Sequence, residues 1–292
     1  MQFYSLEYLP KADFGYLNNS DNNYRKYVAN LFNASYDKKP QNTDGWLVPK
    51  KLLKIDNTSN GERVSGDVLI ESDLFIKKKT VVVKISTNAK LLTQDFESSK
   101  RLNIIKCTNF AKYLGLFTCK DNIKNYSKTY PLPEQFCKKE GDINYFLFMT
   151  YYKLGSLVQY QPENIEQIIS IINQVICANY IAYQKLGFLH NDLHLGNILI
   201  KPTSKQYITY NFAEETKTIL THGIEIIIFD FDRATFDNNR FEMFLSQIMA
   251  LINIYKIKLM EIERWKDINF KDLYKNLYKI TDPKSLLQFI GD

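Results

Sequence analysis

The sequence predicts an α+β fold of two lobes, in which a small strand-rich lobe precedes a larger, mainly helical lobe. Two observations predict it. Short β-rich runs at 52–56, 67–71 and 80–86 are separated by turn residues, a pattern typical of a small antiparallel sheet. After Gly155, apolar residues recur at helical spacing, most clearly between Asn164 and Leu186. The length of 292 residues suits one large domain or two lobes.

The other elements expected along the chain fit this order. Apolar periodicity predicts one helix between Leu91 and Leu114, and two prolines, a glycine and many charges predict a surface excursion over 119–142. A strand is expected at 143–152, a hairpin around Tyr207–Phe212, and helices from Arg240 onward. We divide the chain into an N-terminal extension (1–50), a small lobe (51–149) and a large lobe (150–292).

The composition excludes several classes of protein. With 45% hydrophobic and 24% charged residues, the chain is neither mainly disordered nor fibrous. Its four cysteines have no CxxC spacing, so we expect reduced, buried thiols in an intracellular protein rather than a disulfide framework. The most apolar long stretch, Phe241–Tyr255, is too short to span a bilayer. It predicts a buried helix, and we expect no membrane span.

The charge is mildly basic, with 38 Lys+Arg against 32 Asp+Glu and a formal net charge of +6. Only six of the basic residues are arginines, whereas a surface dedicated to reading phosphates usually uses more. The basic run Lys77–Lys79 falls in a predicted hairpin turn and is expected to be solvated. We therefore expect no specific nucleic-acid binding.

Three polar clusters carry the chemistry. His190–Asn197 reads HNDLHLGN and precedes the apolar run 198–200; Asp230–Asp232 reads DFD and follows the apolar run 226–228; Lys84 follows three valines in a predicted strand. This set, in this order, resembles the protein-kinase superfamily, which has H-x-D-x-x-x-x-N, a D-F-G triplet and a strand lysine. The resemblance covers about 240 residues from Lys51 onward.

The resemblance implies a role for each residue, and the residue types suit these roles. Asp192 would accept the proton of the acceptor hydroxyl. Asn197 and Asp230 offer hard oxygen ligands for Mg²⁺, with Mn²⁺ as the alternative. Lys84 would bind the α- and β-phosphates of ATP and needs a carboxylate to hold it. We choose Glu97 in the predicted helix as that carboxylate, with Asp95 as its competitor.

The nucleotide site is also assigned by resemblance. The run Gly61–Val68 is similar to the glycine-rich loop G-x-G-x-x-G-x-V, with Arg63 in place of the middle glycine. Its glycines permit a tight turn near phosphate, although an ordinary hairpin turn would read the same way. Residues 148–157 are similar to the hinge between kinase lobes. The resemblance thus implies a nucleotide site that consists of Gly61, Gly66, Val68, Val82, Lys84, Met149, Thr150, Tyr152 and Leu199.

Several departures point to one branch of the superfamily. No A-P-E motif follows Asp230, and helix-forming sequence resumes near Arg240, so the activation segment is short. Asn191 stands where most kinases have arginine, which argues against control by a phosphorylated activation loop. The D-F-D triplet is similar to serine/threonine kinases of large DNA viruses, of the poxvirus and asfarvirus types. The 33-residue gap from Asn197 to Asp230 is a haspin-like feature. A viral protein would lie in the host cytoplasm or the virion.

We therefore expect a serine/threonine protein kinase with ATP and a protein hydroxyl as substrates. The alternative is a small-molecule phosphotransferase of the aminoglycoside or choline kinase type, which also places histidine where His194 stands. A pseudokinase scaffold is disfavoured, because Lys84, Asp192, Asn197 and Asp230 are all present. A zinc site at His190 and His194 is disfavoured too, because asparagine replaces the glutamate of H-E-x-x-H. Asp232 either binds metal, pairs with Arg233 or is solvated.

Overall fold

The computed structural model describes residues 3–4, 46–58, 61–71, 76–86, 88–119, 145–237, 239–265 and 279–291. The chain forms two compact units, Met1–Lys100 with Ala111–Tyr151, and Arg101–Phe110 with Tyr152–Asp292; each is described by itself. Both combine helices and strands, which confirms the predicted α+β class. The domain boundaries expected at 50 and 149 stay a prediction, and most of residues 1–50 and 119–142 lies outside the described residues.

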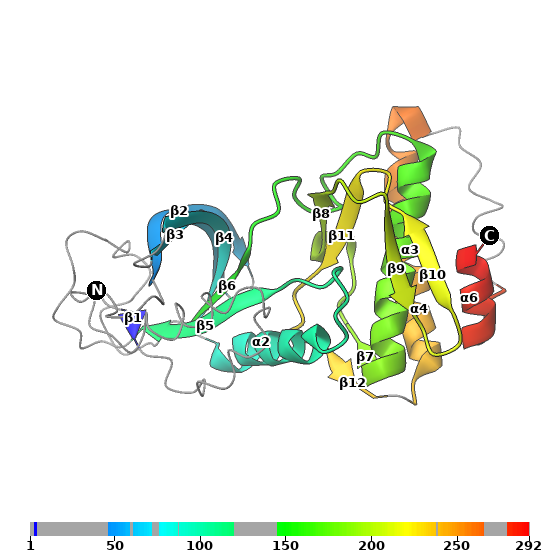
Figure 1. Cartoon of the computed structure of the whole chain (residues 1–292), viewed down its shortest axis with the longest axis horizontal. Coiled ribbons are helices and arrows are strands. Elements are labelled where there is room, and N and C mark those ends of the chain that lie inside the picture. Colours follow the sequence, from blue (N-terminus) through cyan, green and yellow to red (C-terminus); the bar gives the residue numbers. More distant parts are fainter. Residues whose placement is uncertain are drawn as a thin grey trace. The chain divides into compact units, whose positions relative to one another are not determined.

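The first unit is built on a six-stranded sheet in which every pair of neighbouring strands is antiparallel (Figure 1). The order is β1-β5-β6-β4-β3-β2. The three β-rich runs expected at the start of the small lobe form the consecutive hairpins β2–β3–β4. The bounds are β1 Phe3–Tyr4, β2 Trp46–Thr58, β3 Gly61–Glu71, β4 Ile76–Ser86, β5 Tyr113–Cys119 and β6 Tyr145–Thr150.

Two expected turns are strands. The glycine-containing run Gly61–Val68 lies inside β3 and pairs along its whole length with β2. Lys77–Lys79, expected in a turn, lie in β4. The reason is the pairing on both sides of β3, where Gly66 faces Leu52 of β2 and Val81 of β4. A glycine permits a tight turn but does not require one, and ladder hydrogen bonds on both edges favour the extended chain.

The predicted helix between Leu91 and Leu114 is shorter than expected. Helix α2 spans Ala89–Asn103 and begins after Asn88, whose side chain accepts a hydrogen bond from the Leu91 N–H at 3.2 Å. It ends in a turn at 104–106, where Lys106 has a φ of 55°. The chain then enters β5, because pairing with β6 outweighs the continued apolar periodicity.

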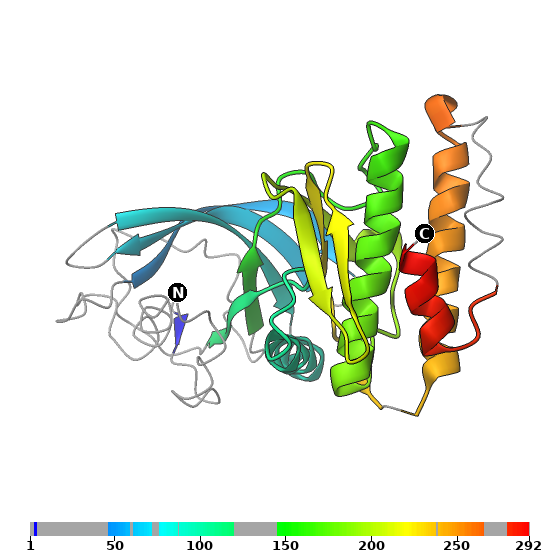
Figure 2. The same ribbon diagram turned by 45° about the vertical axis from the view of Figure 1, so that its right-hand side comes forward.

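The second unit is organised around the long helix α3, Ile165–Leu186. Its range agrees with the predicted helix Asn164–Leu186. Asn164 accepts a hydrogen bond from the Gln167 N–H at 2.8 Å, and Gly187 ends the helix at a φ of 67°. Figure 2 shows β9 and β10 on one side of α3, with α4 and α6 on its other side. The remaining bounds are β7 Phe188–Leu189, η4 Leu195–Asn197, β8 Ile198–Pro202, β9 Tyr207–Asn211, β10 Thr216–Leu220, β11 Ile224–Ile228, β12 Thr235–Phe236, α4 Phe241–Met260, η5 Glu263–Trp265 and α6 Pro283–Gly291.

The strands of this unit pair in three antiparallel two-stranded sheets, β8 with β11, β9 with β10, and β7 with β12. The β9–β10 pair is the hairpin expected around Tyr207–Phe212. The unit therefore contains more β structure than a mainly helical lobe, because the segment between β8 and β11 folds on itself.

A buried polar network ties the segment 101–110 to this unit. The Asn109 side chain, which is fully buried, donates to the Ile226 carbonyl at 2.9 Å and to Gln174 Oε1 at 3.2 Å, and accepts from the Tyr210 hydroxyl at 2.6 Å. Gln174 in turn bonds the backbone of β11 at Ile224 and Ile226. Since buried polar groups need partners, this network specifies how segment 101–110, α3, β9 and β11 fit together.

Helices α3 and α4 are long and apolar enough, by length and composition alone, to cross a membrane. In the most apolar 18-residue stretch of α3, 78% of the residues are buried, as expected of a core helix. In the corresponding stretch of α4, 33% are buried. The predicted buried helix at Phe241–Tyr255 thus extends to Met260 and buries one side only, leaving Met243, Ile254 and Ile257 exposed.

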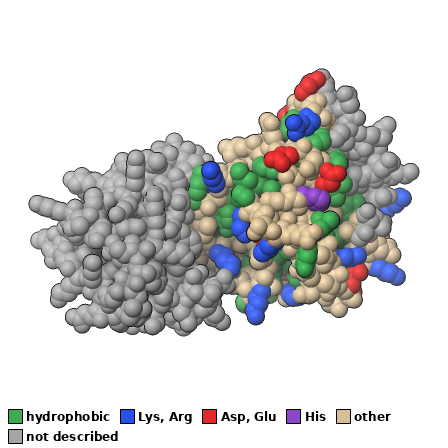
Figure 3. Space-filling view, turned by 45° about the horizontal axis from the view of Figure 1, so that its top comes forward, with side chains coloured by type: hydrophobic (Ala, Val, Ile, Leu, Met, Phe, Trp, Pro, Cys, Tyr) green, Lys and Arg blue, Asp and Glu red, His purple; other side chains and the backbone are tan. Residues whose placement is uncertain are grey.

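Charged side chains of both signs are dispersed over the face in Figure 3, with hydrophobic side chains between them. The coloured part of that face carries no large field of one sign.

The second unit contains a buried carboxylate, Glu225, whose ion pairs can be tested by mutation. Its side chain is fully buried and pairs with Lys201 Nζ at 2.6 Å and with Lys205 Nζ at 3.0 Å. Burial alone would raise the pKa of Glu225, but the hydrogen bonds and charges of the two lysines outweigh it and hold the pKa below the usual 4.5.

We expect Glu225→Gln to lower the free energy of unfolding by about 1–3 kcal/mol at pH 7. A carboxyl group with a lowered pKa stabilises the fold fully above its unfolded-state pKa and loses this effect as the pH falls through the folded-state value. The difference between wild type and variant in urea unfolding should therefore shrink below about pH 4.5. Glu215→Gln, at a half-exposed pair with Lys217, is the control and should change little. A difference that persists unchanged at pH 3 would contradict the pairing.

Candidate functional site

Lys84 lies on the sheet of the first unit and is held by a buried carboxylate. Its Nζ is 3.3 Å from Asp95 Oδ2, and the side chains of the two residues are 10% and 0% exposed. Asp95 Oδ1 accepts a second hydrogen bond, at 2.7 Å, from the hydroxyl of buried Tyr113. Strand β4, helix α2 and strand β5 thus each contribute one group to a buried cation–carboxylate–hydroxyl set.

The pairing corrects our choice of Glu97 as the partner of Lys84. Glu97 is half-exposed and pairs with Lys100 at 3.0 Å, one turn along the same helix. Asp95, two residues earlier, lies on the buried side of α2. Residues two apart on a helix point about 200° apart, so only one of the two carboxylates can face the sheet. The spacing from Lys84 in the sequence could not decide between the two carboxylates. The buried face of α2, which includes Leu92 and Phe96, decides for Asp95.

The nucleotide-site candidates of the first unit lie on neighbouring strands. Val82 of β4 stands opposite Met149 of β6, and Met149 is buried. Thr150 stands opposite Val81 at the end of the same ladder. Gly61, Gly66 and Val68 lie on β3, next to β4. The sheet therefore brings all of these backbones onto three adjacent strands. Tyr152 and Leu199 belong to the second unit.

In the second unit, the candidates Asp192, Asn197 and Asp230 are held by one set of backbone contacts. The Asn197 amide nitrogen donates to the Asp192 carbonyl at 3.0 Å. The Phe229 N–H donates to the Asn197 carbonyl at 3.1 Å and so extends the β8–β11 ladder by one bond. Asp230 comes next and has a φ of 69°, a left-handed conformation that is strained for a residue with a side chain. Such strain is typical of functional positions.

His190 positions the backbone before Asp230. It is buried, and its Nε2–H donates to the Phe229 carbonyl at 3.0 Å. Burial lowers the pKa of His190, and the carbonyl only partly offsets this. The ring packs edge-on against Phe231 at 5.7 Å, and Phe231 also meets Phe110 and Phe188, each at 6.1 Å. The residues on both sides of Asp230 are thus anchored in the core.

The second histidine of this segment has a local role. His194 Nδ1 accepts the Gly196 N–H at 3.0 Å and caps the single turn η4. Among the residues that the structure describes, no group of three or more His, Cys, Asp and Glu side chains is placed to hold a metal ion. The contacts of His190 and His194 are those of structural residues.

Arg233 contacts the carboxylate of Asp192. Its guanidinium nitrogen is 3.6 Å from Asp192 Oδ1, and the two side chains are 62% and 33% exposed. At this exposure the pair contributes little to stability. Asp232 is 9% exposed, so the solvated alternative for this residue is wrong. Arg233 forms an ion pair with Asp192.

Gln247 is a residue that sequence reasoning missed. Its Oε1 accepts the Asn191 N–H at 2.9 Å and its Nε2 donates to Asn191 Oδ1 at 3.3 Å. Asn191 also donates to the Arg233 carbonyl at 3.0 Å and to Thr235 Oγ1 at 2.8 Å. The residue that replaces the kinase arginine therefore joins the segment after Asp230 to helix α4. A polar residue among the apolar residues of α4 was the one available sign.

The segment that resembles a hinge ends in contacts with β8. Gly155, at a φ of 72°, accepts the Ile200 N–H at 2.9 Å, and the Leu157 N–H donates to the Ile198 carbonyl at 2.7 Å. A Cβ on Gly155 would lie 2.5 Å from Gln159 Oε1, so space and φ both favour glycine here. These bonds fix Leu199, which lies between the two bonded residues.

The buried pair Lys84–Asp95 predicts a large loss of stability when its acid is removed. We expect Asp95→Asn to cost about 3–5 kcal/mol in urea unfolding, because a buried lysine would lose its carboxylate. The double variant Lys84→Met/Asp95→Leu should recover most of this. Glu97→Gln, the neighbouring carboxylate, is the control and should stay within about 0.5 kcal/mol of the wild type. Equal losses for Asp95→Asn and Glu97→Gln would show that the pairing is wrong.

Comparisons with known proteins place these features in a family. Residues 18–280 match the family model described as the haspin-like kinase domain. Over 185 residues the chain is 29% identical to the serine/threonine-protein kinase haspin homolog of Drosophila melanogaster, covering 62% of this chain and 31% of that protein. Over 62 residues it is 39% identical to the serine/threonine-protein kinase haspin of Mus musculus, covering 21% and 8%.

A viral relative is similar over a comparable length. The chain is 32% identical over 158 residues to the uncharacterized protein 038R of Invertebrate iridescent virus 3, covering 48% of this chain and 28% of that protein. The chain spans less than half the length of each of these curated relatives. The resemblance to the kinase superfamily with haspin-like features is confirmed. Because the family model matches most of its length, the chain belongs to the haspin-like kinase family.

Proposed function

We propose that the chain is a serine/threonine protein kinase that transfers the γ-phosphate of ATP to a protein hydroxyl. The observation that carries the proposal is the arrangement of Asp192, Asn197 and Asp230. Two hydrogen bonds, from the Asn197 amide nitrogen to the Asp192 carbonyl and from the Phe229 N–H to the Asn197 carbonyl, connect the segment 192–197 with the segment 229–230. The two haspin kinases among the relatives support the reaction class.

The donor set suits magnesium. Asp230 offers a carboxylate and Asn197 an amide oxygen, and the Asn197 amide nitrogen is already engaged by the Asp192 carbonyl, so its oxygen is the atom left to face a cation. Mg²⁺ prefers a few such oxygens together with phosphates and water; Mn²⁺ is the alternative. When bound, the ion would neutralise phosphate charge.

The residues of the chain have separate tasks in this proposal. Asp192 accepts the proton of the attacking hydroxyl. Lys84, oriented by Asp95, binds the phosphates of ATP as a point charge. Val82 and Met149 of the first unit are assigned to adenine binding, as are Leu199 and Tyr152 of the second unit, and the lobe bounds proposed for the chain are 51–149 and 150–292. Arg233, next to the Asp192 carboxylate, holds it in place between turnovers.

The direct test is transfer of labelled γ-phosphate from Mg-ATP by the purified chain. We expect label on protein serine and threonine, and a fall of about 10²–10⁴-fold in Asp192→Asn, because the general base is lost. Lys84→Met should fall by a similar factor, whereas Lys90→Met, at an exposed position of helix α2, should retain the wild-type rate.

A parallel tube contains choline and aminoglycosides as acceptors. Label on these and none on protein would move the chain to the small-molecule phosphotransferases. Label on neither, together with ATP binding, would favour a scaffold and contradict the proposal. Comparable losses in the Asp192, Lys84 and Lys90 variants would contradict the residue roles.

We also expect activity without phosphorylation of the segment after Asp230. Asn191 and Gln247 already hold that segment by neutral hydrogen bonds, and the residue directly before Asp192 is Asn191 rather than an arginine that could bind a phosphate. Thr235 carries the only hydroxyl between 231 and 240. Phosphatase treatment, with loss of phosphate at Thr235 verified by mass spectrometry, should leave the rate within twofold. A loss of tenfold or more, restored by rephosphorylation, would contradict this expectation.

A further inference from the structure

Strand β9 has one edge with no partner strand among the described residues. It pairs only with β10, in a two-stranded sheet. At the two ends of the hairpin the Phe212 N–H donates to the Glu215 carbonyl, and the Thr221 N–H donates to the Gln206 carbonyl. Hydrogen-bonded pairs alternate along an antiparallel ladder. Ile208 and Tyr210 therefore bond to β10.

It follows that the N–H and C=O groups of Tyr207, Thr209 and Asn211 point away from β10. Within the part of the chain that the structure describes, no backbone hydrogen bond to these three groups is present. An edge of this kind can accept an extended peptide as an added strand.

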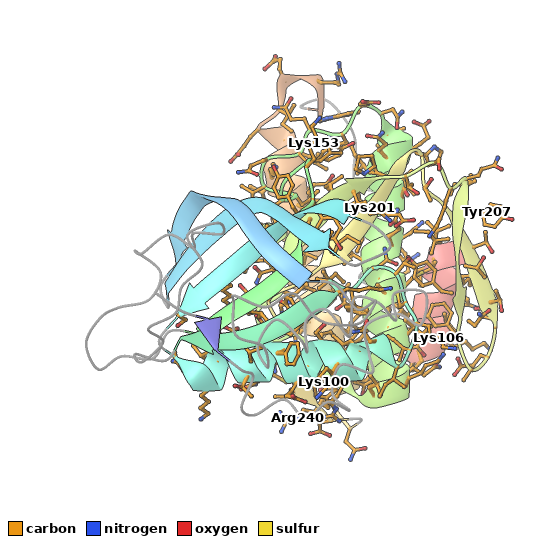
Figure 4. The ribbon with its side chains drawn as sticks, turned by 60° about the vertical axis from the view of Figure 1, so that its left-hand side comes forward. Lys100, Lys106, Lys153, Lys201, Tyr207 and Arg240 are labelled. Carbon is orange, nitrogen blue, oxygen red and sulfur yellow. The ribbon has the colours of Figure 1, made fainter. Side chains whose placement is uncertain are left out.

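The open edge borders a cavity of about 420 Å³. All five residues of β9 line it, and on its other sides lie the segment 105–108 and the last turns of α3. Figure 4 labels Lys106 on the segment after α2 and Tyr207 at the start of β9. Three lysines from three different elements line the cavity: Lys106, Lys185 and Lys205.

The cavity is electrostatically positive. Lys205 shares Glu225 with Lys201, but Lys106 and Lys185 form no ion pair with an acidic side chain among the described residues. The one thiol in the lining, Cys107, stays neutral because burial raises its pKa to about 12. Lys106 also has a left-handed φ of 55°, which costs energy for a residue with a side chain and is typical of functional positions.

We propose that this surface, the β9 edge with Lys106, Lys185 and Lys205, binds an extended acidic peptide of a partner protein as an additional strand beside β9. The peptide backbone bonds Tyr207, Thr209 and Asn211, and its carboxylates face the lysines. A nucleic acid would match the charge but cannot satisfy alternating N–H and C=O groups along a strand. This docking site is independent of phosphoryl transfer.

The test measures fluorescence anisotropy of a labelled ten-residue peptide of alternating glutamate and threonine, added to the full chain without ATP. We expect saturable binding that weakens with salt. A peptide with lysine in place of glutamate, and the acidic peptide N-methylated at alternate residues, should bind at least tenfold more weakly. The lysine peptide tests charge, and the N-methylated peptide tests strand addition.

Two pairs of variants separate the surface from the rest of the chain. Lys106→Glu/Lys185→Glu should weaken binding at least tenfold, whereas the matched double Lys90→Glu/Lys284→Glu, at exposed lysines that do not line the cavity, should not.

Thr209→Pro removes an outward N–H of β9 without touching the β9–β10 ladder. Thr218→Pro makes the same change on β10, at the cross-strand partner of Thr209. Only Thr209→Pro should weaken binding.

Equal effects of the two proline variants, or of the two double variants, would overturn the proposal. So would the absence of saturable binding, or a single-stranded oligonucleotide that binds more tightly than the acidic peptide and loses affinity in Lys106→Glu/Lys185→Glu. Kinase activity of the same preparations, measured separately, shows whether the proposed function fails independently.

Discussion

The hydrogen bond from the Phe229 N–H to the Asn197 carbonyl is the interaction on which the candidate site depends. It continues the buried β8–β11 ladder by one step, so the residue after β11 and the residue before β8 cannot separate. Asn197 then bonds the Asp192 carbonyl, and His190 bonds the Phe229 carbonyl from the other side. Two short and mainly apolar strands, β8 and β11, thus determine where three separate polar residues lie. The strained backbone of Asp230 is maintained because residues on both sides of it are anchored.

Polar groups, rather than apolar contacts alone, specify how the elements of the second unit combine. Asn109, Gln174 and Tyr210 are buried with their hydrogen bonds made, and they connect segments more than 50 residues apart in sequence. The Lys84–Asp95–Tyr113 set does the same within the first unit. A buried ion pair adds little net stability compared with apolar packing. Its presence at Lys84 is therefore better explained by the orientation of a cation than by stability.

The segment between β8 and β11 separates two roles of the second unit. The first and last residues of this segment, Thr203 and Gly223, continue the β8–β11 ladder, which holds Asn197 and Asp230. The middle of the segment forms the β9–β10 hairpin, whose open edge lies beside the basic cavity. Glu225 lies between the two, because it is part of β11 and also holds Lys201 and Lys205. The exposed residues of the hairpin can therefore vary in sequence without displacing the candidate site, as long as the ladder, Glu225 and the buried Tyr210 remain.

The α+β class, the hairpins β2–β3–β4 and β9–β10, the bounds of α3 and the kinase superfamily could all be predicted from the sequence, because they depend on local periodicity and motif spacing. Tertiary structure decided the rest. Helix α2 ended at Asn103 and β5 followed, since pairing with β6 outweighed helical spacing. The run Gly61–Val68 became a strand because partners stood on both sides. Asp95 replaced Glu97, and Gln247 joined Asn191, because contacts between distant residues depend on which face of a helix is buried, a property that sequence spacing alone does not contain.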